Sequence, residues 1–417
     1  MTPRPSPSRL LLHPLRLLAP VALVAALSGG CATETTRVVV DTDLAAEAGA
    51  VVCVEPHAAR IGATVLARGG NAVDAAVATA FALAVTWPEA GNLGGGGFLL
   101  HRAADGEASF VDYRETAPGA ATPDLFLRPD GTVDPIRVRL GYLPVGVPGT
   151  VAGLAAAHER FGTIPWAELV APARRLAEDG ILVDAALAES IARAAAELSR
   201  CDEASRIFLR PDGAPLGVGD RLVQKDLAAS LALVEAQGPR AFYEGEIARR
   251  IVDDSTARGG ILARADLASY RAVFREPVRG EYRGATVIAG PPPTSGGCVL
   301  VESLNQLEGF DPAALGVGSA EELHLLGEVL RRSFLDRARF LGDPDFVSNP
   351  LDRILGDAHA ASLRAGIDPS RATPSDVLAA GLDGTLPPAE GSTTHFSVVD
   401  RHGNAVANTT TLEESWG

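Results

Sequence analysis

The sequence is poor in lysine, cysteine and aromatic residues. Lys225 is its single lysine, and phenylalanine, tryptophan and tyrosine together make up 5% of the 417 residues. Because Lys225 lies in a polar stretch with helical character, nothing favours lysine-based Schiff-base chemistry. The four cysteines are widely scattered at Cys31, Cys53, Cys201 and Cys298, so we expect no framework of disulfide bridges.

Positive charge is also scarce. The chain has 37 Lys and Arg against 52 Asp and Glu, which gives a net charge of -15. Such a surface repels phosphate backbones, so the composition argues against nucleic-acid binding. With 47% hydrophobic and 21% charged residues, the composition is that of a globular protein with a large core. A small polar substrate fits this balance better than a polyanion.

The N-terminal apolar run, Leu17 to Leu27, is too short for a stable membrane span. Arginines precede it and small residues follow it up to Cys31, which is the pattern of an export signal. We therefore interpret residues 1–31 as an export signal, with the lipoprotein type as one alternative, and residues 32–48 as a tether. The expected location is periplasmic, anchored by lipid at Cys31, or secreted, and lipidation stays open.

Several familiar site motifs are missing. There is no G-x-S-x-G elbow, no H-E-x-x-H and no paired cysteine spacing. The eight histidines, among them His57, His324 and His395, are expected to be hydrogen-bonded or surface groups, so we predict no metal and no cofactor. The glycines from Gly94 to Gly97 lack the Gly-Lys-Ser/Thr ending of a phosphate cradle and precede a strand. A close approach of backbones explains them better.

Local patterns predict a mixed α/β protein. Asn71 is a good N-cap for a helix to about Val85, whose all-round apolar surface indicates burial. Residues 151–272 are mostly helical in pattern. The other expected strands are Val51–Val54, Phe98–His101, Ser109–Tyr113 and Tyr282–Ala289, and the other expected helices are His57–Arg68, Val299–Leu307 and Glu321–Phe340.

The C-terminal stretch predicts a β-hairpin. Two strand-like runs, Phe396–Asp400 and Asn404–Leu412, are separated by Arg401-His402-Gly403, whose glycine can adopt the left-handed conformation. If Asp400 faces Asn404, counting outward places Thr393 opposite Thr411 on one face of the sheet. Glu413 belongs to the same face.

The hydroxyl of a threonine on a rigid strand becomes an effective nucleophile only if a base takes its proton. The threonine's own α-amine can serve, but it exists only after the preceding peptide bond breaks. Cleavage between Ser392 and Thr393 would create that amine, at the end of a stretch rich in Pro, Gly, Ser and Ala. Taken alone, the pattern leaves a plain structural hairpin as the alternative.

The segment GSTTHFSVVDRHGNAVANTTTLE, residues 391–413, resembles the processing site of γ-glutamyltransferases over its whole length. Four more stretches match in the family's order: GGNAVDAAVA (69–78), GNLGGGGF (91–98), DYRETAP (112–118) and PPPTSGG (291–297). Together they cover the chain from about Gly49 to its end. We therefore identify the chain by resemblance as a member of this family.

The resemblance implies an α/β (α+β) fold, the N-terminal-nucleophile hydrolase αββα four-layer sandwich. One precursor is cut into two subunits that form a heterodimer, with residues 49–392 as the large subunit and 393–417 as the start of the small one. Thr393 matches the nucleophile and Thr411 its hydrogen-bonding partner. Arg114 matches the arginine that holds the donor's α-carboxylate, and Glu413 falls near its α-amine. A guanidinium and a carboxylate suit these two groups.

The implied reaction is transfer of the γ-glutamyl group of glutathione or a related donor to water or to an amino-acid or peptide amine. The family's oxyanion-hole donors, a Gly-Gly pair far into the small subunit, have no match before Gly417. The sequence therefore predicts a copy incomplete at the C-terminus, in which the hairpin from Thr393 to Glu413 has an open edge.

Two alternatives remain. A related acylase of the cephalosporin or glutaryl type shares the fold and the threonine, and Arg114 argues against it because a guanidinium suits an α-carboxylate. The second alternative is an exported binding protein that never cleaves itself. For Glu413 taken alone, an edge charge that discourages strand addition also remains possible.

Overall fold

The computed structural model describes residues 47–379 and 393–417. The predicted export signal, residues 32–46 of the predicted tether, and Ser392 with the connection before it lie outside the described residues. Within the described ranges, no helix is both long and apolar enough to cross a membrane.

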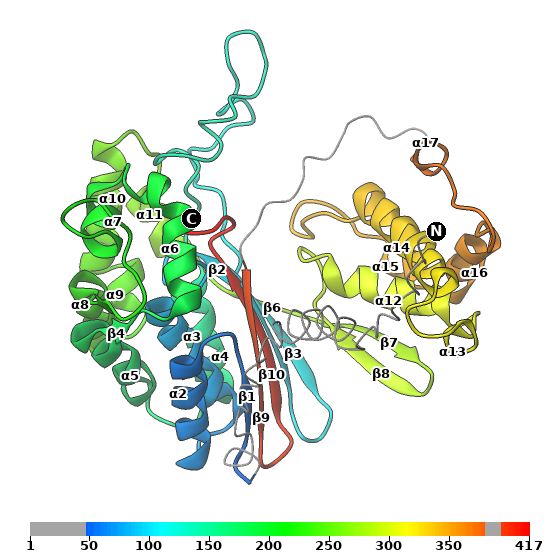
Figure 1. Cartoon of the computed structure of the whole chain (residues 1–417), viewed down its shortest axis with the longest axis horizontal. Helices are drawn as coiled ribbons and strands as arrows, with labels where there is room; N and C mark the ends of the chain where they lie inside the picture. Colours follow the sequence, from blue (N-terminus) through cyan, green and yellow to red (C-terminus); the bar gives the residue numbers. More distant parts are fainter. Residues whose placement is uncertain (1–46, 380–392) are drawn as a thin grey trace, which may run out of the picture. The chain divides into compact units, whose positions relative to one another are not determined.

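The described part of the chain contains both strands and helices, in runs of one kind or the other (Figure 1). The strands are β1 (Gly49–Val52), β2 (Gly96–Arg102), β3 (Ala108–Asp112), β4 (Ile181–Leu182), β5 (Arg221–Leu222), β6 (Val273–Arg275), β7 (Val278–Tyr282), β8 (Ala285–Ala289), β9 (Thr393–Asp400) and β10 (Ala405–Thr411). The helices are α2 (Pro56–Ala67), α3 (Ala72–Thr86), α4 (Thr150–Phe161), α5 (Trp166–Asp179), α6 (Ala185–Leu198), α7 (Asp202–Phe208), α8 (Lys225–Gln237), α9 (Arg240–Tyr243), α10 (Glu246–Ala257), α11 (Arg264–Ser269), α12 (Gly296–Leu307), α13 (Pro312–Leu315), α14 (Ala320–Phe340), α15 (Leu351–Ile354), α16 (Asp357–Ala365) and α17 (Ser375–Leu378).

An antiparallel sheet in the order β1-β9-β10-β2-β3-β6 holds the C-terminal hairpin at its centre. Strand β1 pairs along β9, and β2 pairs along β10 (Figure 1). The expectation that the hairpin has an open edge is therefore wrong. Its neighbours come from residues some 300 positions earlier in the chain, a pairing that the local pattern of the hairpin does not contain.

The predicted register of the hairpin is confirmed, because Thr393 lies opposite Thr411. Gly403 takes the left-handed conformation with φ 87°. The buried Asp400 carboxylate accepts hydrogen bonds from the backbone N–H groups of His402 and Asn404, at 2.8 and 3.0 Å. Turn geometry and side-chain bonds thus fix which residues face each other.

Helix α3 packs against the hairpin on one face of the sheet. All of its residues are buried, as its apolar surface predicted, and Asn71 caps it in a reciprocal capping box with Asp74. The helix contacts β9 and β10, while α2 contacts β1 and α4 contacts β2 and β3. Phe396, Val398 and Val406 of the hairpin join the same apolar core. The face of the hairpin with Thr393 and Thr411 is the opposite one.

Two expected strands differ from the structure. The first strand spans β1, Gly49–Val52, two residues before the expected range. The single strand expected over Tyr282–Ala289 is wrong, because the segment is the second half of the hairpin β7–β8. Its turn residues Arg283 and Gly284 both have positive φ, at 51° and 81°. An Arg-Gly pair is an unusual turn of this kind, so composition alone did not indicate a chain reversal. The hairpin packs on α12.

Candidate active site

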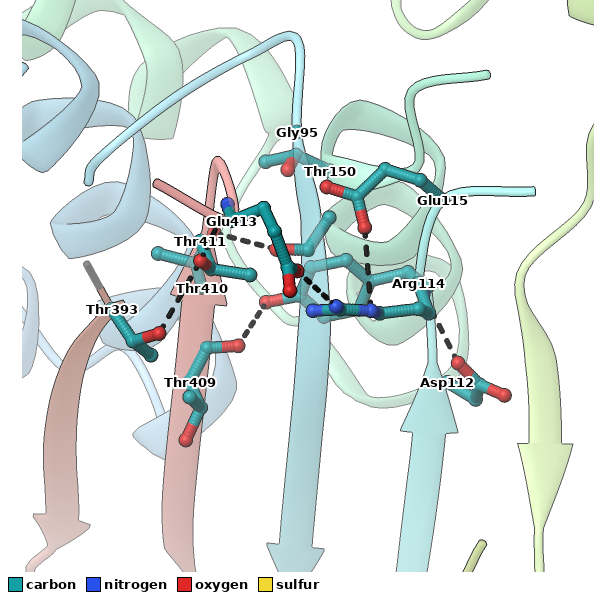
Figure 2. Close-up of polar contacts among 12 residues, drawn as sticks. Gly95, Asp112, Arg114, Glu115, Thr150, Thr393, Thr409, Thr410, Thr411 and Glu413 are labelled. Atoms are coloured by element: carbon teal, nitrogen blue, oxygen red, sulfur yellow. Dashed lines mark hydrogen bonds and ion pairs between the residues drawn. The ribbon is translucent and has the colours of Figure 1, made fainter. Parts of the chain in front are cut away.

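The ends of β9 and β10 bring two threonine hydroxyls together (Figure 2). Thr393 Oγ1 and Thr411 Oγ1 lie 3.3 Å apart and are hydrogen-bonded. Thr393 is exposed on its strand end, whereas Thr411 is 4% exposed. The pair therefore offers one accessible hydroxyl that is hydrogen-bonded to a second, buried one.

Thr411 also accepts a hydrogen bond from Glu413, the second residue after the strand. The backbone N–H of Glu413 donates to Thr411 Oγ1 over 2.9 Å. Glu413 has φ 75°, the left-handed region that costs a non-glycine residue about 1 kcal/mol. This conformation turns the Glu413 carboxylate toward Arg114, with which it forms an ion pair (Figure 2). The strain is thus associated with a specific electrostatic contact.

Arg114 is placed by the end of β3. Its backbone N–H donates to Asp112 Oδ1 over 3.0 Å, and its carbonyl accepts from the Tyr270 hydroxyl over 2.8 Å. Its side chain remains 37% exposed, so the guanidinium is accessible while its backbone is fixed. The structure therefore brings the candidate residues Thr393, Thr411, Arg114 and Glu413 into one constellation.

Glu115 is a neighbour of this constellation that the sequence analysis did not single out. Its carboxylate lies 3.6 Å from the Arg114 Nε. Burial raises the pKa of Glu115, against the opposing effect of the Arg114 charge. Since DYRETAP already places Glu115 next to Arg114, the motif carried the signal, but burial of its side chain became visible only in the structure.

A pocket of about 350 Å³ opens over the threonine pair. Thr393, Thr411 and Arg114 line it together with Phe98 and Phe110, whose rings stack with centroids 5.5 Å apart. Two residues of a distant motif, Thr294 and Gly297, also line it, as does Gly290 just before that motif. The volume suits a small polar group held between the Thr393 hydroxyl and the Arg114 guanidinium. The PPPTSGG stretch, quoted only for its resemblance, thus forms part of the pocket wall.

His395 lies beside the same pocket. Its ring contacts the Thr409 hydroxyl through Nδ1 at 2.8 Å and the Ser397 hydroxyl through Nε2 at 3.3 Å. Both contacts lie on the face of the hairpin that carries Thr393. The imidazole is therefore hydrogen-bonded, as the sequence analysis expected of the histidines, and it borders the pocket rather than a bulk surface.

Asn92 makes several buried hydrogen bonds that the sequence analysis did not predict. Its Nδ2 donates to the Thr411 carbonyl over 3.0 Å and to Thr410 Oγ1 over 3.1 Å. Its Oδ1 accepts from the Gly95 N–H over 2.8 Å and from Thr150 Oγ1 over 2.6 Å. This buried amide uses both its donor and acceptor groups to hold the glycine-rich segment against the end of β10.

The glycines of this segment permit that close approach. A Cβ at Gly95 would lie 2.1 Å from the Thr411 carbonyl oxygen, and one at Gly97 would lie 2.1 Å from the Thr409 carbonyl oxygen. At Gly94, no heavy atom of the described chain other than those of its two sequence neighbours lies within 4 Å of the corresponding position. The expectation of a close backbone approach is confirmed at Gly95 and Gly97, while Gly94 has no such constraint.

Gly95→Ala is therefore expected to destabilise the fold by about 1–3 kcal/mol, because the methyl group forces β10 away from β2. The shift displaces Thr411 and slows any reaction that depends on its hydroxyl. Urea unfolding of Gly95→Ala and of the matched control Gly94→Ala measures the effect. Equal midpoints for the two variants would contradict the close-approach explanation.

The chain is similar to known proteins over most of its length. The family model described as gamma-glutamyltranspeptidase matches residues 58–417. The chain is 42% identical over 409 residues to the glutathione hydrolase proenzyme of Escherichia coli (strain K12), covering 95% of this chain and 70% of the relative. It is 43% identical over 376 residues to the acylase ACY 1 proenzyme of Pseudomonas sp. (strain V22), covering 88% of this chain and 66% of that relative. The crystal structure of gamma-glutamyltranspeptidase from Helicobacter pylori matches with a TM-score of 0.77 and 40% identity, over 80% of this chain and 97% of that one.

Proposed function

The chain belongs to the γ-glutamyltranspeptidase family, and we propose that it is the precursor of an enzyme that transfers a γ-glutamyl group through Thr393. Its fold class is that of the N-terminal-nucleophile hydrolases, as predicted. The observation that carries the assignment of residues is the contact between Thr393 and Thr411, in a pocket shared with Arg114.

The first step is self-cleavage. The Thr393 hydroxyl oxygen attacks the carbonyl carbon of Ser392, the C–N bond breaks, and the nitrogen takes a proton to become the free α-amine. Water then hydrolyses the ester and releases the Ser392 carboxylate. Thr411 supports this step because its side chain holds the attacking oxygen in a fixed direction. The products are two subunits whose strands β1, β9, β10 and β2 share one sheet.

The second step is turnover. The α-amine of Thr393 accepts the hydroxyl proton as the oxygen attacks the γ-carbonyl of the donor, and the leaving amine departs with a proton. Glutathione is the donor class we propose, since the Escherichia coli relative is named a glutathione hydrolase. Water returns free glutamate from the acyl-enzyme, whereas an amino-acid or peptide amine accepts the group in a transpeptidation.

The ion pair between Arg114 and Glu413 explains how the pocket selects its donor. A γ-glutamyl group carries an α-carboxylate and an α-ammonium on one carbon. When it binds, the carboxylate takes the place of Glu413 on Arg114, and the ammonium takes the place of Arg114 on Glu413. Both side chains keep an opposite charge throughout, so the exchange leaves no charge unpaired.

The acylase alternative retains support from the Pseudomonas relative. Arg114 does not separate the two functions, contrary to the sequence argument, because a glutaryl group carries the corresponding carboxylate. It lacks only the α-ammonium. Glu413 is therefore the residue that distinguishes the two donors. A bound glutaryl group has no ammonium to pair with the Glu413 carboxylate.

A pair of chromogenic anilides, γ-glutamyl and glutaryl, tests this proposal on the complete gene product. We expect kcat/KM to favour the γ-glutamyl anilide by roughly 10- to 100-fold, the value of one charge-assisted hydrogen bond. Glu413→Gln is expected to remove most of that preference while leaving self-cleavage intact. A preference for the glutaryl anilide would instead establish the acylase function.

Export remains our proposal for the location, on the strength of the N-terminal pattern. Labelling of growing cells with a radioactive fatty acid, followed by immunoprecipitation, separates lipidation at Cys31 from simple export.

A further inference from the structure

Three helices outside the candidate active site bring together a buried glutamate, an aspartate and a histidine. Glu302 lies on α12, Asp336 on α14 and His359 on α16, and these helices contact one another pairwise (Figure 1). Glu302 is 1% exposed and Asp336 is 4% exposed, whereas His359 is partly buried. One ligand atom from each side chain lies within 4.8 Å of the others.

The contacts within this Glu302–Asp336–His359 cluster leave one oxygen without a partner. His359 Nε2 is hydrogen-bonded to Asp336 Oδ2 and lies 3.7 Å from Glu302 Oε1. Among residues 47–379 and 393–417, none donates a hydrogen bond to Glu302 Oε1, although this oxygen is buried and lies on the side of the histidine. An unpaired buried carboxylate oxygen is costly, so its retention calls for a partner.

The cluster also gathers two acidic side chains around one imidazole. Glu302 and Asp336 are 1% and 4% exposed, and each has a carboxylate oxygen within 4.8 Å of the same histidine nitrogen. Buried carboxylates that lie this close together need a proton or a cation between them.

We propose that the Glu302–Asp336–His359 cluster is a structural site for a divalent transition-metal ion, with Zn²⁺ as the ion that its ligands suit best. One imidazole nitrogen and two carboxylate oxygens are ligands that zinc accepts, whereas Mg²⁺ and Ca²⁺ prefer oxygen alone. In a four-coordinate zinc site, ligand atoms lie roughly 3.4 Å apart, given metal–ligand bonds of about 2.1 Å. The separation of 3.7 Å between His359 Nε2 and Glu302 Oε1 is close to this value.

The His359–Asp336 contact is the part of the cluster that must change. Its two atoms form a direct hydrogen bond, which lengthens when both bind one ion, and the His359 proton at Nε2 is released. Because His359 is partly buried, a water molecule can complete the fourth position from that side. The ion then gives Glu302 Oε1 a partner and neutralises the charges of both carboxylates.

Such an ion would stabilise the part of the pocket wall that α12 provides. Helix α12 begins at Gly296, two residues after Thr294, and both Thr294 and Gly297 line the pocket over Thr393. An ion that joins α12 to α14 and α16 would fix the orientation of α12, and with it the position of its N-terminal end at the pocket. The expected role is therefore stability of the pocket wall, with no part in the chemistry at Thr393.

Metal titration of the complete gene product tests this site. Protein stripped with EDTA and dialysed is titrated with ZnCl₂, MnCl₂ and MgCl₂ in a calorimeter, and bound metal is counted by mass spectrometry. We expect uptake of about one Zn²⁺ per chain, weaker binding of Mn²⁺, no binding of Mg²⁺, and a rise of several degrees in the unfolding midpoint with Zn²⁺. Absence of Zn²⁺ and Mn²⁺ uptake by the stripped wild-type protein overturns the proposal.

Variants locate the ion. Glu302→Gln and His359→Gln are each expected to weaken Zn²⁺ binding at least about tenfold and to lose the thermal shift. His324→Gln is the matched control, since His324 lies on α14 and contacts the Asp368 carbonyl at the surface. Equal Zn²⁺ binding by all four proteins would place the ion elsewhere. The proposal is also wrong if the wild type binds no metal and the Glu302→Gln variant is more stable than the wild type in EDTA. That result would show that a proton shared between the side chains, and no metal ion, stabilises the cluster.

Discussion

Replacing Thr393 by alanine is expected to leave the precursor in one piece and to lower the turnover of a γ-glutamyl donor by at least about 10⁴-fold. Loss of a nucleophile in comparable acyl-transfer sites has effects of this size. Two reactions fail for one reason, because the same hydroxyl oxygen attacks the Ser392 carbonyl and later the donor. The effect is measured by gel separation of the subunits and by release of the chromogenic amine.

Thr393→Ser is the matched control, because it keeps the hydroxyl and removes only a methyl group. We expect it to cleave itself and to turn over donor at a reduced rate. The difference between the two variants isolates the oxygen from the packing of the strand end. If Thr393→Ala were cut at the same bond as the wild type, another residue or a separate protease would perform the cleavage.

Replacing Arg114 by glutamine is expected to lower kcat/KM for the γ-glutamyl donor by about 10²–10³-fold, mainly through KM. The guanidinium offers paired donors to the α-carboxylate, and its loss also leaves Glu413 without a cation. Self-cleavage is expected to continue, because no donor takes part in it. This separation of the two reactions distinguishes a binding role from a loss of folding.

Arg139→Gln is a suitable control for Arg114→Gln. Arg139 forms an ion pair with Glu414, the neighbour of Glu413, and it is likewise partly exposed. It does not line the pocket of about 350 Å³ over Thr393. We expect a change of less than about threefold in kcat/KM, typical of an exposed pair. Equal losses in the two variants would assign Arg114 a general electrostatic effect instead of a specific contact.

The sequence predicted the hairpin well because its determinants are local. The loop Arg401-His402-Gly403 sets the turn, and a two-residue period along each strand then determines that Thr393 faces Thr411. The same holds for Asn71, whose capping role depends on residues within one turn of α3. Where the cause of a structure lies within a few residues, the pattern was sufficient.

The features that sequence reasoning missed depend on distant residues. Asn92 joins Gly95 to Thr411 across more than 300 positions, and no period or spacing records such a bond. The neighbours β1 and β2 of the hairpin are equally remote, so its central place in the sheet was not foreseen. The Glu302–Asp336–His359 cluster comes from three helices, so its members form no short motif.

The positions of the candidate site residues were predictable mainly through the resemblance of five motifs. The hairpin register alone gives the proximity of Thr393 and Thr411, but it does not relate either residue to Arg114. The structure supplies that relation through a shared pocket and the ion pair with Glu413. Chemistry at the site therefore follows from a combination of local strand geometry and long-range packing.

The central claim is that Thr393 becomes an N-terminal nucleophile. Intact-mass measurement and N-terminal sequencing of the complete gene product, after incubation at neutral pH beside Thr393→Ala, test it most directly. The account predicts that the wild type alone yields a fragment beginning Thr-Thr-His-Phe. A wild-type chain that stays whole, or that is cut at a different bond, contradicts it and leaves the threonine pair as part of an ordinary hairpin.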